Sequence, residues 1–406
     1  LALGQGDERS RVNAIKALNS YKDDIAVLDT LRPLLSNNSV HLAESYADML
    51  YASNAAGMYV RLNDMIPSIN NLRIKARLLQ AQMKNTSLGM GNSKTYIQET
   101  VNNLIKQSNN EYEKGELIKV LGHDPYQYLN IINMSASSAV EKVAKINALQ
   151  YILDGRDFIA AYKNNYIRVK REIINYFASQ MKEGDPSIVT QVATLLQKDN
   201  NQAKLILQDS TLIDAVLTKL KSPDDLEAIQ EVKKLEAYLS STSYEAPKVE
   251  KYKPINFALF EGKGDSIEVT MKTDNGNVVM VLFPKVAPQT VSSFIELCNK
   301  GYFNNKSFHR VVPNFVVQGG CPRGDGSGSL DFTLRTEVPQ VYYDGPGCIG
   351  MASAGFHTES CQFFITHSAT PHLDGKYTLF GKVIKGMGVV NEIGIGDRII
   401  DTFVKK

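Results

Sequence analysis

The stretch SFHRVVPNFVVQGG, residues 307–320, sets one permanent cation, Arg310, among valines and phenylalanines and ends in two glycines. β-Branched and aromatic residues in such a run are typical of paired, half-buried strands. A charged side chain is rarely placed among apolar neighbours unless it has a specific partner or task. We therefore expect Arg310 to carry a particular role in the protein.

The overall composition is that of an ordinary globular protein. The chain has 406 residues, 43% of them hydrophobic, and this length favours two or more domains. The formal net charge of +2 is too small to indicate a nucleic-acid or anionic-membrane partner. Because no apolar run reaches 18 residues, the sequence predicts no membrane-spanning segment.

Glycine divides the chain into two parts with different patterns. Residues 1–240 hold 9 glycines and residues 241–406 hold 19, which indicates many more turns in the second part. In the first part, apolar residues recur at helical spacing, as in Val140, Ile146 and Leu149. This spacing predicts amphipathic helices, each of about 12 to 18 residues.

Three dipeptides in the first part have helix-start chemistry. Asp124-Pro125, Asp185-Pro186 and Ser222-Pro223 each place a capping side chain directly before a proline. Proline is favoured at the first position of a helix, where its missing N–H costs nothing. Each dipeptide therefore predicts a helix that begins at the proline.

Successive amphipathic helices without strands must bury their apolar faces against one another, in an open stack or in a closed bundle. The segments RSRVNAIKALN, from Arg9, and RVKREIINYFASQM, from Arg168, resemble second helices of HEAT-like repeats. We expect a HEAT-like array, with an irregular helical bundle as the alternative. An array would offer a surface to a protein partner or client. The plainer interpretation of its tyrosines, such as Tyr126 and Tyr162, is a solvated repeat surface.

The second part begins after a linker. SSTSYEAPKVEKYKP, residues 240–254, mixes serine, proline and lysine without a period. From Ser266, two alternating segments flank Asp274-Asn275-Gly276 and predict a β-hairpin, and residues 288–299 predict a short helix. We place a helical domain at residues 1–240, a linker at 241–258 and a mainly β domain at 259–406.

All four cysteines lie in the last third of the chain, without a CxxC pair or zinc-ribbon spacing. They are Cys298, Cys321, Cys348 and Cys361. We expect buried free thiols, with a disulfide or a metal site as the alternative.

Four motifs in order carry a family resemblance: SFHRVVPNFVVQGG, GMASAG from Gly350, CQFFITHS from Cys361 and LDGKYTLFGKVIKGM from Leu373. Together they resemble the cyclophilins, the barrel-type peptidyl-prolyl cis-trans isomerases, over about residues 266–404. The resemblance implies an eight-stranded antiparallel barrel capped by helices. It also implies a proline-binding groove on the outer face of the barrel and no cofactor.

Period-two alternation supports this assignment from the residues alone. In CQFFIT, Cys361, Phe363 and Ile365 share one strand face, which is wholly apolar and is predicted to be core. Gln362 and Phe364 share the other face, where an amide beside an aromatic ring suits a groove for a peptide.

The chemistry of proline isomerisation needs few groups. Amide resonance gives X-Pro rotation a barrier of about 18 to 20 kcal/mol, and no proton or nucleophile is required. Rotation localises the lone pair on the prolyl nitrogen, where a fixed donor can stabilise the twisted amide. Arg310 is the candidate catalytic donor, because it is permanently charged and aimed by its strand.

The resemblance also implies a substrate-binding set around Arg310. Its members are Phe315, Val316, Phe364 and Leu373 for the proline ring, Gln318 and Gln362 for Arg310 and the substrate backbone, and Ala352 and Ser353 for the preceding residue. Val316, His372 and Tyr377 depart from the eukaryotic pattern of Met, Trp and His, as in bacterial-type members. His372 and Tyr377 can still supply a ring edge and a hydroxyl.

The same residues allow other interpretations. Arg310 could be a structural ion-pair residue, and His357, Cys361, His367 and His372 could suggest a metal site, but Cys361 belongs to the core face, so no metal is predicted. PRGDGSGS, residues 322–329, lacks the GK[ST] ending of a phosphate loop and is expected to be an ordinary glycine-rich loop.

The sequence therefore predicts a peptidyl-prolyl cis-trans isomerase of bacterial cyclophilin type, joined to a HEAT-like array that binds a partner or client. Its substrates would be proline-containing polypeptides, and its role would be to assist folding. The alternative is a binding module that holds proline peptides without turnover. Because the chain opens with Leu1 inside a helical pattern, we expect a trimmed or processed product, and a bacterial periplasm or cell envelope is favoured over the cytoplasm.

Overall fold

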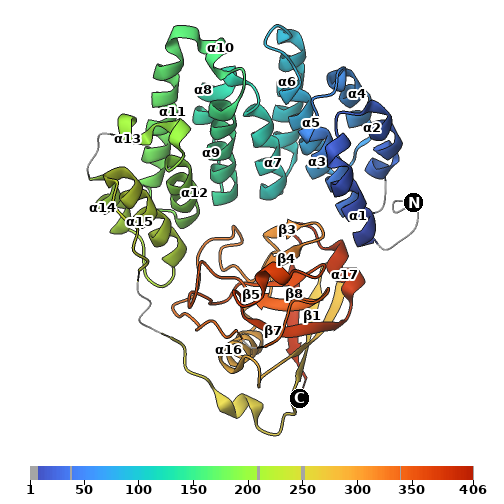
Figure 1. Cartoon of the computed structure of the whole chain (residues 1–406), viewed down its shortest axis with the longest axis vertical. Helices are drawn as coiled ribbons and strands as arrows, with labels where there is room; N and C mark the ends of the chain where they lie inside the picture. The colour runs from blue at the N-terminus through green and yellow to red at the C-terminus, as the bar shows by residue number, and fades with distance from the viewer. Residues whose placement is uncertain (1–7, 37–38, 208–210, 248–251, 339, 406) are drawn as a thin grey trace. The chain divides into compact units, whose positions relative to one another are not determined.

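The computed structural model describes residues 8–36, 39–207, 211–247, 252–338 and 340–405 (Figure 1). The chain forms two compact units. The helical unit comprises residues 1–220 and 231–245, and the sheet unit comprises residues 221–230 and 246–406. Helices followed by an eight-stranded antiparallel sheet confirm the predicted fold class. Among the described residues, no helix combines the length and apolar character needed to cross a membrane.

The helical unit is built from a series of long and short helices. They are α1 (Glu8–Ala17), α2 (Ile25–Leu31), α3 (Val40–Ala52), α4 (Met58–Met65), α5 (Leu72–Lys84), α6 (Gly91–Gln107), α7 (Glu111–Leu121), α8 (Tyr128–Asn133), α9 (Ala139–Asp154), α10 (Phe158–Tyr162), α11 (Tyr166–Met181), α12 (Pro186–Leu196), α13 (Ala203–Ile206), α14 (Leu212–Leu217) and α15 (Leu226–Ser240).

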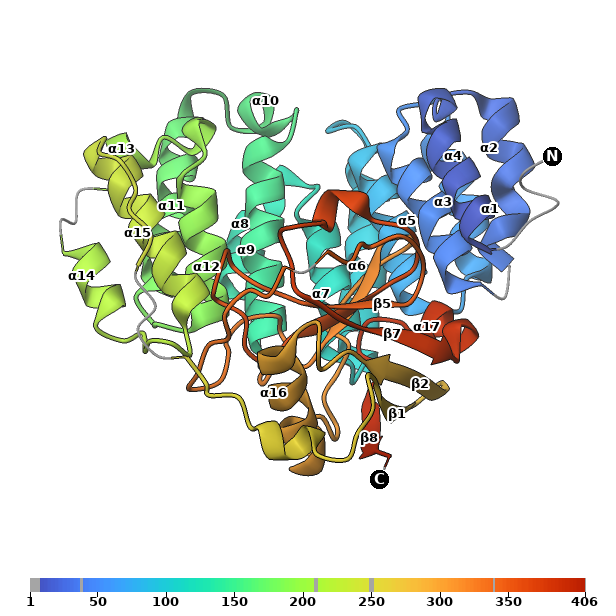
Figure 2. The ribbon, with the colours of Figure 1, turned by 60° about the horizontal axis from the view of Figure 1, so that its bottom comes forward.

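Helices of the helical unit pack mainly on near neighbours in the sequence. α3 packs on α1 and α5, α7 packs on α5 and α9, and α9 packs on α12. The shorter helices α4, α8 and α10 pack on α5, α9 and α11, respectively. Figures 1 and 2 show the same order as a row that runs from α1 through α7 to α12. Packing of this serial kind is that of a helical stack, in which each layer buries the apolar face of the next.

Two of the three predicted helix starts have capping geometry. The Asp185 side chain accepts hydrogen bonds from the backbone N–H groups of Ser187 and Ile188, and α12 begins at Pro186 as predicted. Asp124 accepts from the N–H of Tyr126, but the turn that follows is the 3₁₀ helix η4 (Pro125–Gln127). The prediction at Ser222-Pro223 is wrong, because a turn occupies residues 222–225 and α15 begins at Leu226.

The predicted helix length is right for only part of the unit. α3 and α5 have 13 residues, and α9 and α11 have 16, but α2 has 7, α8 has 6 and α10 has 5. For α2 the reason is chemical, because Pro33 follows Leu31 and Arg32 and disfavours helical geometry just before it.

The sheet unit contains eight strands in a single antiparallel sheet. They are β1 (Ile267–Thr273), β2 (Gly276–Leu282), β3 (Arg310–Val312), β4 (Val316–Gly319), β5 (Cys348–Met351), β6 (Phe363–Thr366), β7 (Leu379–Lys385) and β8 (Ile399–Val404). Their order in the sheet is β3-β4-β6-β5-β7-β2-β1-β8. An isolated antiparallel bridge between Ser307 and Arg398 links the segments that lead into the edge strands β3 and β8. The sheet is therefore curled until its two edges meet at one end.

The local predictions for the sheet unit are confirmed. β1 and β2 form the expected hairpin, with Thr273 opposite Gly276. α16 (Pro288–Asn299) is the expected helix and packs near β8, whereas α17 (Met387–Glu392) packs near β2. The four cysteines are buried free thiols.

Two apolar clusters lie on opposite faces of the sheet. The main core contains Val317, Phe363 and Ile365 together with Phe294 of α16. A smaller cluster contains Val316 and Phe364. Since neighbouring residues of one strand fall into different clusters, the predicted two-face alternation of β6 is confirmed, with Cys361, Phe363 and Ile365 in the core.

Candidate active site

Arg310 begins β3 and lies on the outer face of the sheet. Its neighbour Val311 is in the main core, so strand alternation directs Arg310 to the other face, where it is exposed. Directly opposite in the ladder is Gln318 of β4. Gln318 is in turn opposite Phe364 of β6. The sheet register thus brings the predicted catalytic cation, an amide and an aromatic ring side by side across three strands.

A chain of hydrogen bonds connects Arg310 to a glycine-rich loop. The Arg310 Nη1 donates to Gln318 Oε1 at 3.5 Å, and Gln318 Nε2 donates to Gln362 Oε1 at 3.1 Å. Gln362 Nε2 then donates to the backbone carbonyls of Gly326 and Gly328, each at 3.0 Å. We call this chain the glutamine relay, and its members are Arg310, Gln318, Gln362, Gly326 and Gly328.

The orientation of both amides in the glutamine relay follows from its fixed end. The carbonyl oxygens of Gly326 and Gly328 can only accept, so the amide nitrogen of Gln362 must face them. The Gln362 oxygen is then left to accept from Gln318. Gln318 consequently presents its oxygen, and not its N–H₂ group, to Arg310. The guanidinium meets an acceptor, which holds it without repulsion.

An apolar cluster lies beside Arg310 on the same outer face of the sheet. Val316, Phe364 and Leu373 are buried, with exposed fractions of 2%, 5% and 7%. The cluster also contains buried Tyr343, Cys348 and Leu379, and the partly buried Phe315, Ala352, Tyr377, Phe283 and Val341. An apolar surface next to a fixed cation can hold a small ring while the cation engages a polar atom of the same ligand.

Aromatic rings form the rim of this outer cluster. Phe315 stacks on His372 with ring centroids 5.4 Å apart, and the Arg310 Cζ lies 5.8 Å from the Phe315 centroid. The Tyr377 ring meets Phe364 edge-on at 5.9 Å. His372 is exposed, whereas Phe315 and Tyr377 are partly buried. His372 and Tyr377, which replace the residues of the eukaryotic pattern, therefore both contribute rings here.

The remaining predicted residues follow β5. The backbone N–H of Ala352 donates to the carbonyl of Gln362 at 2.9 Å, which ties this segment to the residue at the centre of the glutamine relay. Ser353 is partly exposed next to Ala352, and its side chain makes none of the contacts described above. All eleven predicted residues thus come from β3, from β4 and β6 with the residue directly before each, from the segment after β5, and from the 3₁₀ helix η8 (Pro371–Leu373) with the segment after it.

Three features of the site were missed from the sequence. Gly326 and Gly328 were interpreted only as parts of a glycine-rich loop, although both have positive φ angles and both carbonyls are relay acceptors. Tyr343 is 1% exposed and stacks behind Phe364 at 5.7 Å. The sequence did offer one signal, the glycines at every second position of residues 324–328. Glycine adopts positive φ more readily than other residues, so this spacing predicts a specific backbone conformation in the loop.

The two basic side chains next to each other in β3 and the segment before it, His309 and Arg310, differ in charge at neutral pH. Burial lowers the pKa of His309 to about 4, with nearby Asp325 acting in the opposite direction, so the imidazole is neutral. Partial burial also lowers the pKa of Arg310, and Tyr377 acts in the opposite direction, but a guanidinium stays protonated in proteins. A Cβ on Gly326 would lie 3.2 Å from His309 Cδ2, so the loop packs closely over this neutral ring.

Comparison with known proteins identifies the family. The model described as "Cyclophilin type peptidyl-prolyl cis-trans isomerase/CLD" matches residues 268–404. A peptidyl-prolyl cis-trans isomerase of Helicobacter pylori is 44% identical over 140 residues, which is 33% of this chain and 84% of that protein. Peptidyl-prolyl cis-trans isomerase B of Bacillus subtilis is 41% identical over 125 residues, covering 30% of this chain and 87% of that protein.

A eukaryotic protein matches to a similar degree. Peptidyl-prolyl cis-trans isomerase-like 1 of Gibberella zeae is 40% identical over 131 residues, covering 31% of this chain and 81% of that protein. The chain therefore belongs to the cyclophilin-type peptidyl-prolyl cis-trans isomerases, and its sheet unit carries the isomerase domain. Residues 1–267 lie outside the family match.

Proposed function

We propose that the sheet unit rotates X-Pro bonds of polypeptide clients, with Arg310 as the catalytic residue. In this proposal Phe315, Val316, Phe364, Leu373, His372 and Tyr377 hold the proline ring and its surroundings. Ala352 and Ser353 line the path of the residue before proline, and Gln318 and Gln362 position Arg310 and bind the client backbone. The departures at Val316, His372 and Tyr377 favour the bacterial type of the family.

The physical requirement for catalysis is differential binding. In the planar amide the prolyl nitrogen shares its lone pair with the carbonyl, and in the twisted transition state the lone pair is free to accept a hydrogen bond. A charged donor fixed near that nitrogen binds the twisted state more strongly than the planar state. Each tenfold gain in rate requires about 1.4 kcal/mol of such difference, which lies within reach of one charge-assisted hydrogen bond.

One observation carries this proposal: the glutamine relay ends on Arg310 at the border of the outer apolar cluster. Gln362 is anchored by two carbonyls at 3.0 Å, whereas the last contact, from Arg310 to Gln318, is 3.5 Å long. The guanidinium is thus oriented by one acceptor and keeps its other N–H groups for a substrate. Pre-organisation of this kind avoids the cost of ordering the donor during the reaction.

We further propose that the helical unit is a HEAT-like array that binds a protein partner or a folding client. Its serial packing, with α3, α5, α7 and α9 as successive layers, supports an extended surface. Two units in one chain would hold a client on one and supply isomerase activity from the other, which raises the effective concentration of proline sites.

A refolding assay with the full chain tests whether the protein rotates X-Pro bonds in a polypeptide client. The substrate is a denatured protein whose refolding is limited by one X-Pro bond, a step that takes tens to hundreds of seconds without catalyst. We expect the wild-type chain to accelerate the slow phase and Arg310→Ala to lose at least about tenfold of that acceleration. Arg335→Ala is the control, because Arg335 is an exposed arginine that lies over the Tyr252 ring. An unchanged slow phase with the wild-type chain would refute the proposal.

A further inference from the structure

The helical unit contains a pocket of about 320 Å³ that no part of the isomerase function uses. It lies where α3, α5, α7 and α9 reach their C-terminal ends and where α10 begins. Its lining includes Tyr51, Lys84, His123, Tyr151, Arg156 and Phe158. One edge of the stack thus gathers side chains from four successive layers in a single concave site. A volume of this order suits one large side chain with adjoining backbone.

Three rings form one wall of the pocket. His123 lies between two tyrosines, stacked on Tyr151 at 5.0 Å with an interplanar angle of 17° and edge-on to Tyr51 at 5.5 Å. Burial lowers the pKa of His123 to about 3, with Arg77 and Lys84 acting in the same direction. The imidazole is therefore neutral at pH 7, and the three rings form an uncharged aromatic wall.

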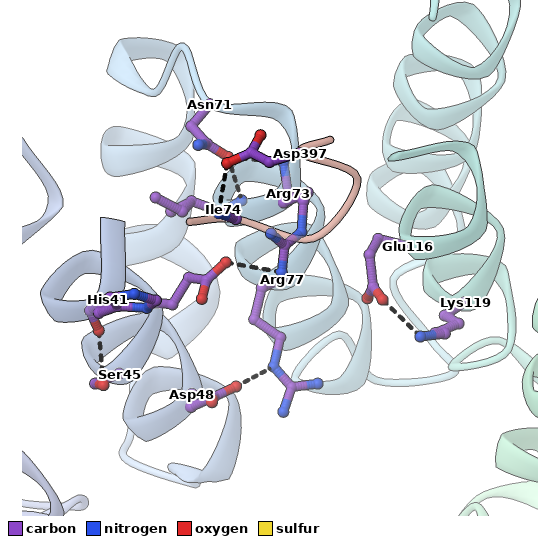
Figure 3. Close-up of polar contacts among 12 residues, drawn as sticks. His41, Ser45, Asp48, Asn71, Arg73, Ile74, Arg77, Glu116, Lys119 and Asp397 are labelled. Carbon is purple, nitrogen blue, oxygen red and sulfur yellow. Dashed lines mark hydrogen bonds and ion pairs between the residues drawn. The ribbon is translucent and has the colours of Figure 1, made fainter. Parts of the chain in front are cut away.

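A polar network holds Tyr51 in place. The Arg77 Cζ lies 3.6 Å from the centroid of the Tyr51 ring, and Arg77 Nε donates to Asp48 Oδ1 at 2.7 Å. Arg77 Nη1 also donates to Gln80 Oε1 at 3.0 Å. Figure 3 shows Arg77 of α5 reaching Asp48 on α3, with the Glu116–Lys119 pair of α7 nearby. These contacts fix the Tyr51 ring, and a ring that is already fixed loses less conformational freedom on binding.

The rim of the pocket carries two cations, Lys84 and Arg156, of which Arg156 pairs with Asp157 at 3.4 Å. Lys84 Nζ donates to the Tyr51 carbonyl at 2.9 Å, and among the described residues no carboxylate lies within ion-pair distance of it. Burial lowers the pKa of Lys84, and Arg156 and Arg77 lower it further, while Asp23 acts in the opposite direction. The lining carboxylate Asp154 is already engaged by Lys198 and Asn200, at 3.4 and 2.8 Å. An incoming carboxylate would supply Lys84 with a counter-ion.

We propose that this pocket binds an extended polypeptide segment with a large apolar side chain next to an acidic one. The apolar side chain lies against Tyr151 and His123, and the acidic side chain pairs with Lys84. The proposal rests on the client-binding role proposed for the helical unit and is independent of Arg310. A polypeptide is favoured because the aromatic surface continues beyond the pocket: the ring of the lining residue Phe158 meets Tyr162 at 5.5 Å, and Tyr162 meets Tyr126, which is 55% exposed, at 6.0 Å.

Fluorescence anisotropy with the full chain tests the proposal. The probe is a labelled peptide with a Glu-Phe-Glu core in a Gly-Ser context, without proline, so that the isomerase site is not its target. Matched probes carry Gln-Phe-Gln or Glu-Ala-Glu. We expect the Glu-Phe-Glu probe to bind in a salt-dependent manner and each matched probe to bind at least about fivefold more weakly. These comparisons need no altered protein.

Variants locate the binding site. We expect Lys84→Gln to weaken the Glu-Phe-Glu probe about three- to fivefold and Tyr151→Ala to weaken it about tenfold. Lys84→Arg and Tyr151→Phe keep the charge and the ring and should bind as the wild type does. Lys170→Gln is the matched control, because Lys170 also donates to a backbone carbonyl, that of Asn200 at 2.8 Å, but lies outside the pocket.

Three results would overturn the proposal: equal binding of all three peptides, full binding by both Lys84→Gln and Tyr151→Ala, and complete competition by free phenylacetate at the concentration of the peptide. The last result would assign the pocket to a small aromatic acid. Peptide isomerisation by the same preparations separates this test from that of Arg310, because the pocket variants should retain wild-type turnover of a short proline peptide.

Discussion

Gln318 lies directly opposite Arg310 in the β3–β4 ladder, and its side-chain oxygen accepts a hydrogen bond from the guanidinium at 3.5 Å. This contact is at the long limit of a hydrogen bond, whereas the bonds behind it in the glutamine relay measure 3.1 and 3.0 Å. The hydrogen bonds of the glutamine relay are therefore shorter near the loop than at Arg310. Arg310 is thus aimed by its surroundings and remains available to a substrate.

Replacing one amide of the glutamine relay by a carboxylate should lower turnover. Gln362→Glu removes the N–H₂ group that donates to the Gly326 and Gly328 carbonyls and puts negative charge against them. We expect kcat/KM for a short proline peptide to fall roughly tenfold, which corresponds to about 1.4 kcal/mol. Gln340→Glu is the control, because Gln340 is exposed and lies outside the relay. Equal turnover in the two variants would show that the relay does not position Arg310.

Adding one methyl group behind the outer cluster should weaken substrate binding. Gly350 is buried in β5, and a Cβ there would collide with the Tyr343 hydroxyl and the Phe364 ring. We expect Gly350→Ala to raise KM several-fold and to lower the free energy of unfolding by about 1 to 3 kcal/mol. In the control, Gly345→Ala, the added Cβ meets open space. A lowered melting temperature with an unchanged KM would mean that Phe364 does not contact the proline ring.

The stability of the protein should fall as pH rises through neutrality, because of one buried carboxyl. Burial raises the pKa of Glu359 to about 8 from an ordinary value of 4.5, although Thr378 donates to both carboxyl oxygens at 2.9 Å. In the unfolded chain this group ionises near 4.5. The contribution to folding is therefore complete below that pH and is lost as pH rises from there through about 8.

Glu359→Gln keeps a donor and an acceptor but cannot ionise, so it should flatten this pH dependence. We expect the melting temperature of the wild type to drop by several degrees more than that of the variant between pH 5 and pH 9, measured by calorimetry or circular dichroism. The exposed Glu261 supplies the matched substitution, Glu261→Gln. Parallel curves for the wild type and Glu359→Gln would contradict the assignment of a raised pKa to Glu359.

Local patterns predicted the elements of the site well. Strand alternation separated Phe363 from Phe364, and the Asp274-Asn275-Gly276 turn gave the β1–β2 hairpin, because both depend on residues close together in the chain. Asp185 was a reliable cap for the same reason. At Ser222-Pro223 the local signal was overridden, and the helix begins three residues after the proline, at Leu226.

Contacts between residues that lie far apart in the sequence could not be predicted. Gln362 meets Gly326 across 36 positions, and nothing in CQFFITHS indicates that its amide points to the loop at residues 322–329. Tyr343 lies behind Phe364 through packing that has no sequence period. The pocket at Tyr51, His123 and Tyr151 was missed likewise, since its residues come from four separate layers of helices.

We propose that the Arg310 guanidinium stabilises the twisted X-Pro amide. The most direct test of this claim is the cis–trans exchange rate of a peptide with one Ala-Pro bond, measured by NMR with full-length wild type, Arg310→Lys, Arg310→Ala and the control Arg335→Ala. We expect at least about a tenfold loss of kcat/KM in Arg310→Ala and an intermediate loss in Arg310→Lys, which keeps the charge without the planar fork. Wild-type exchange rates in Arg310→Ala would contradict the claim.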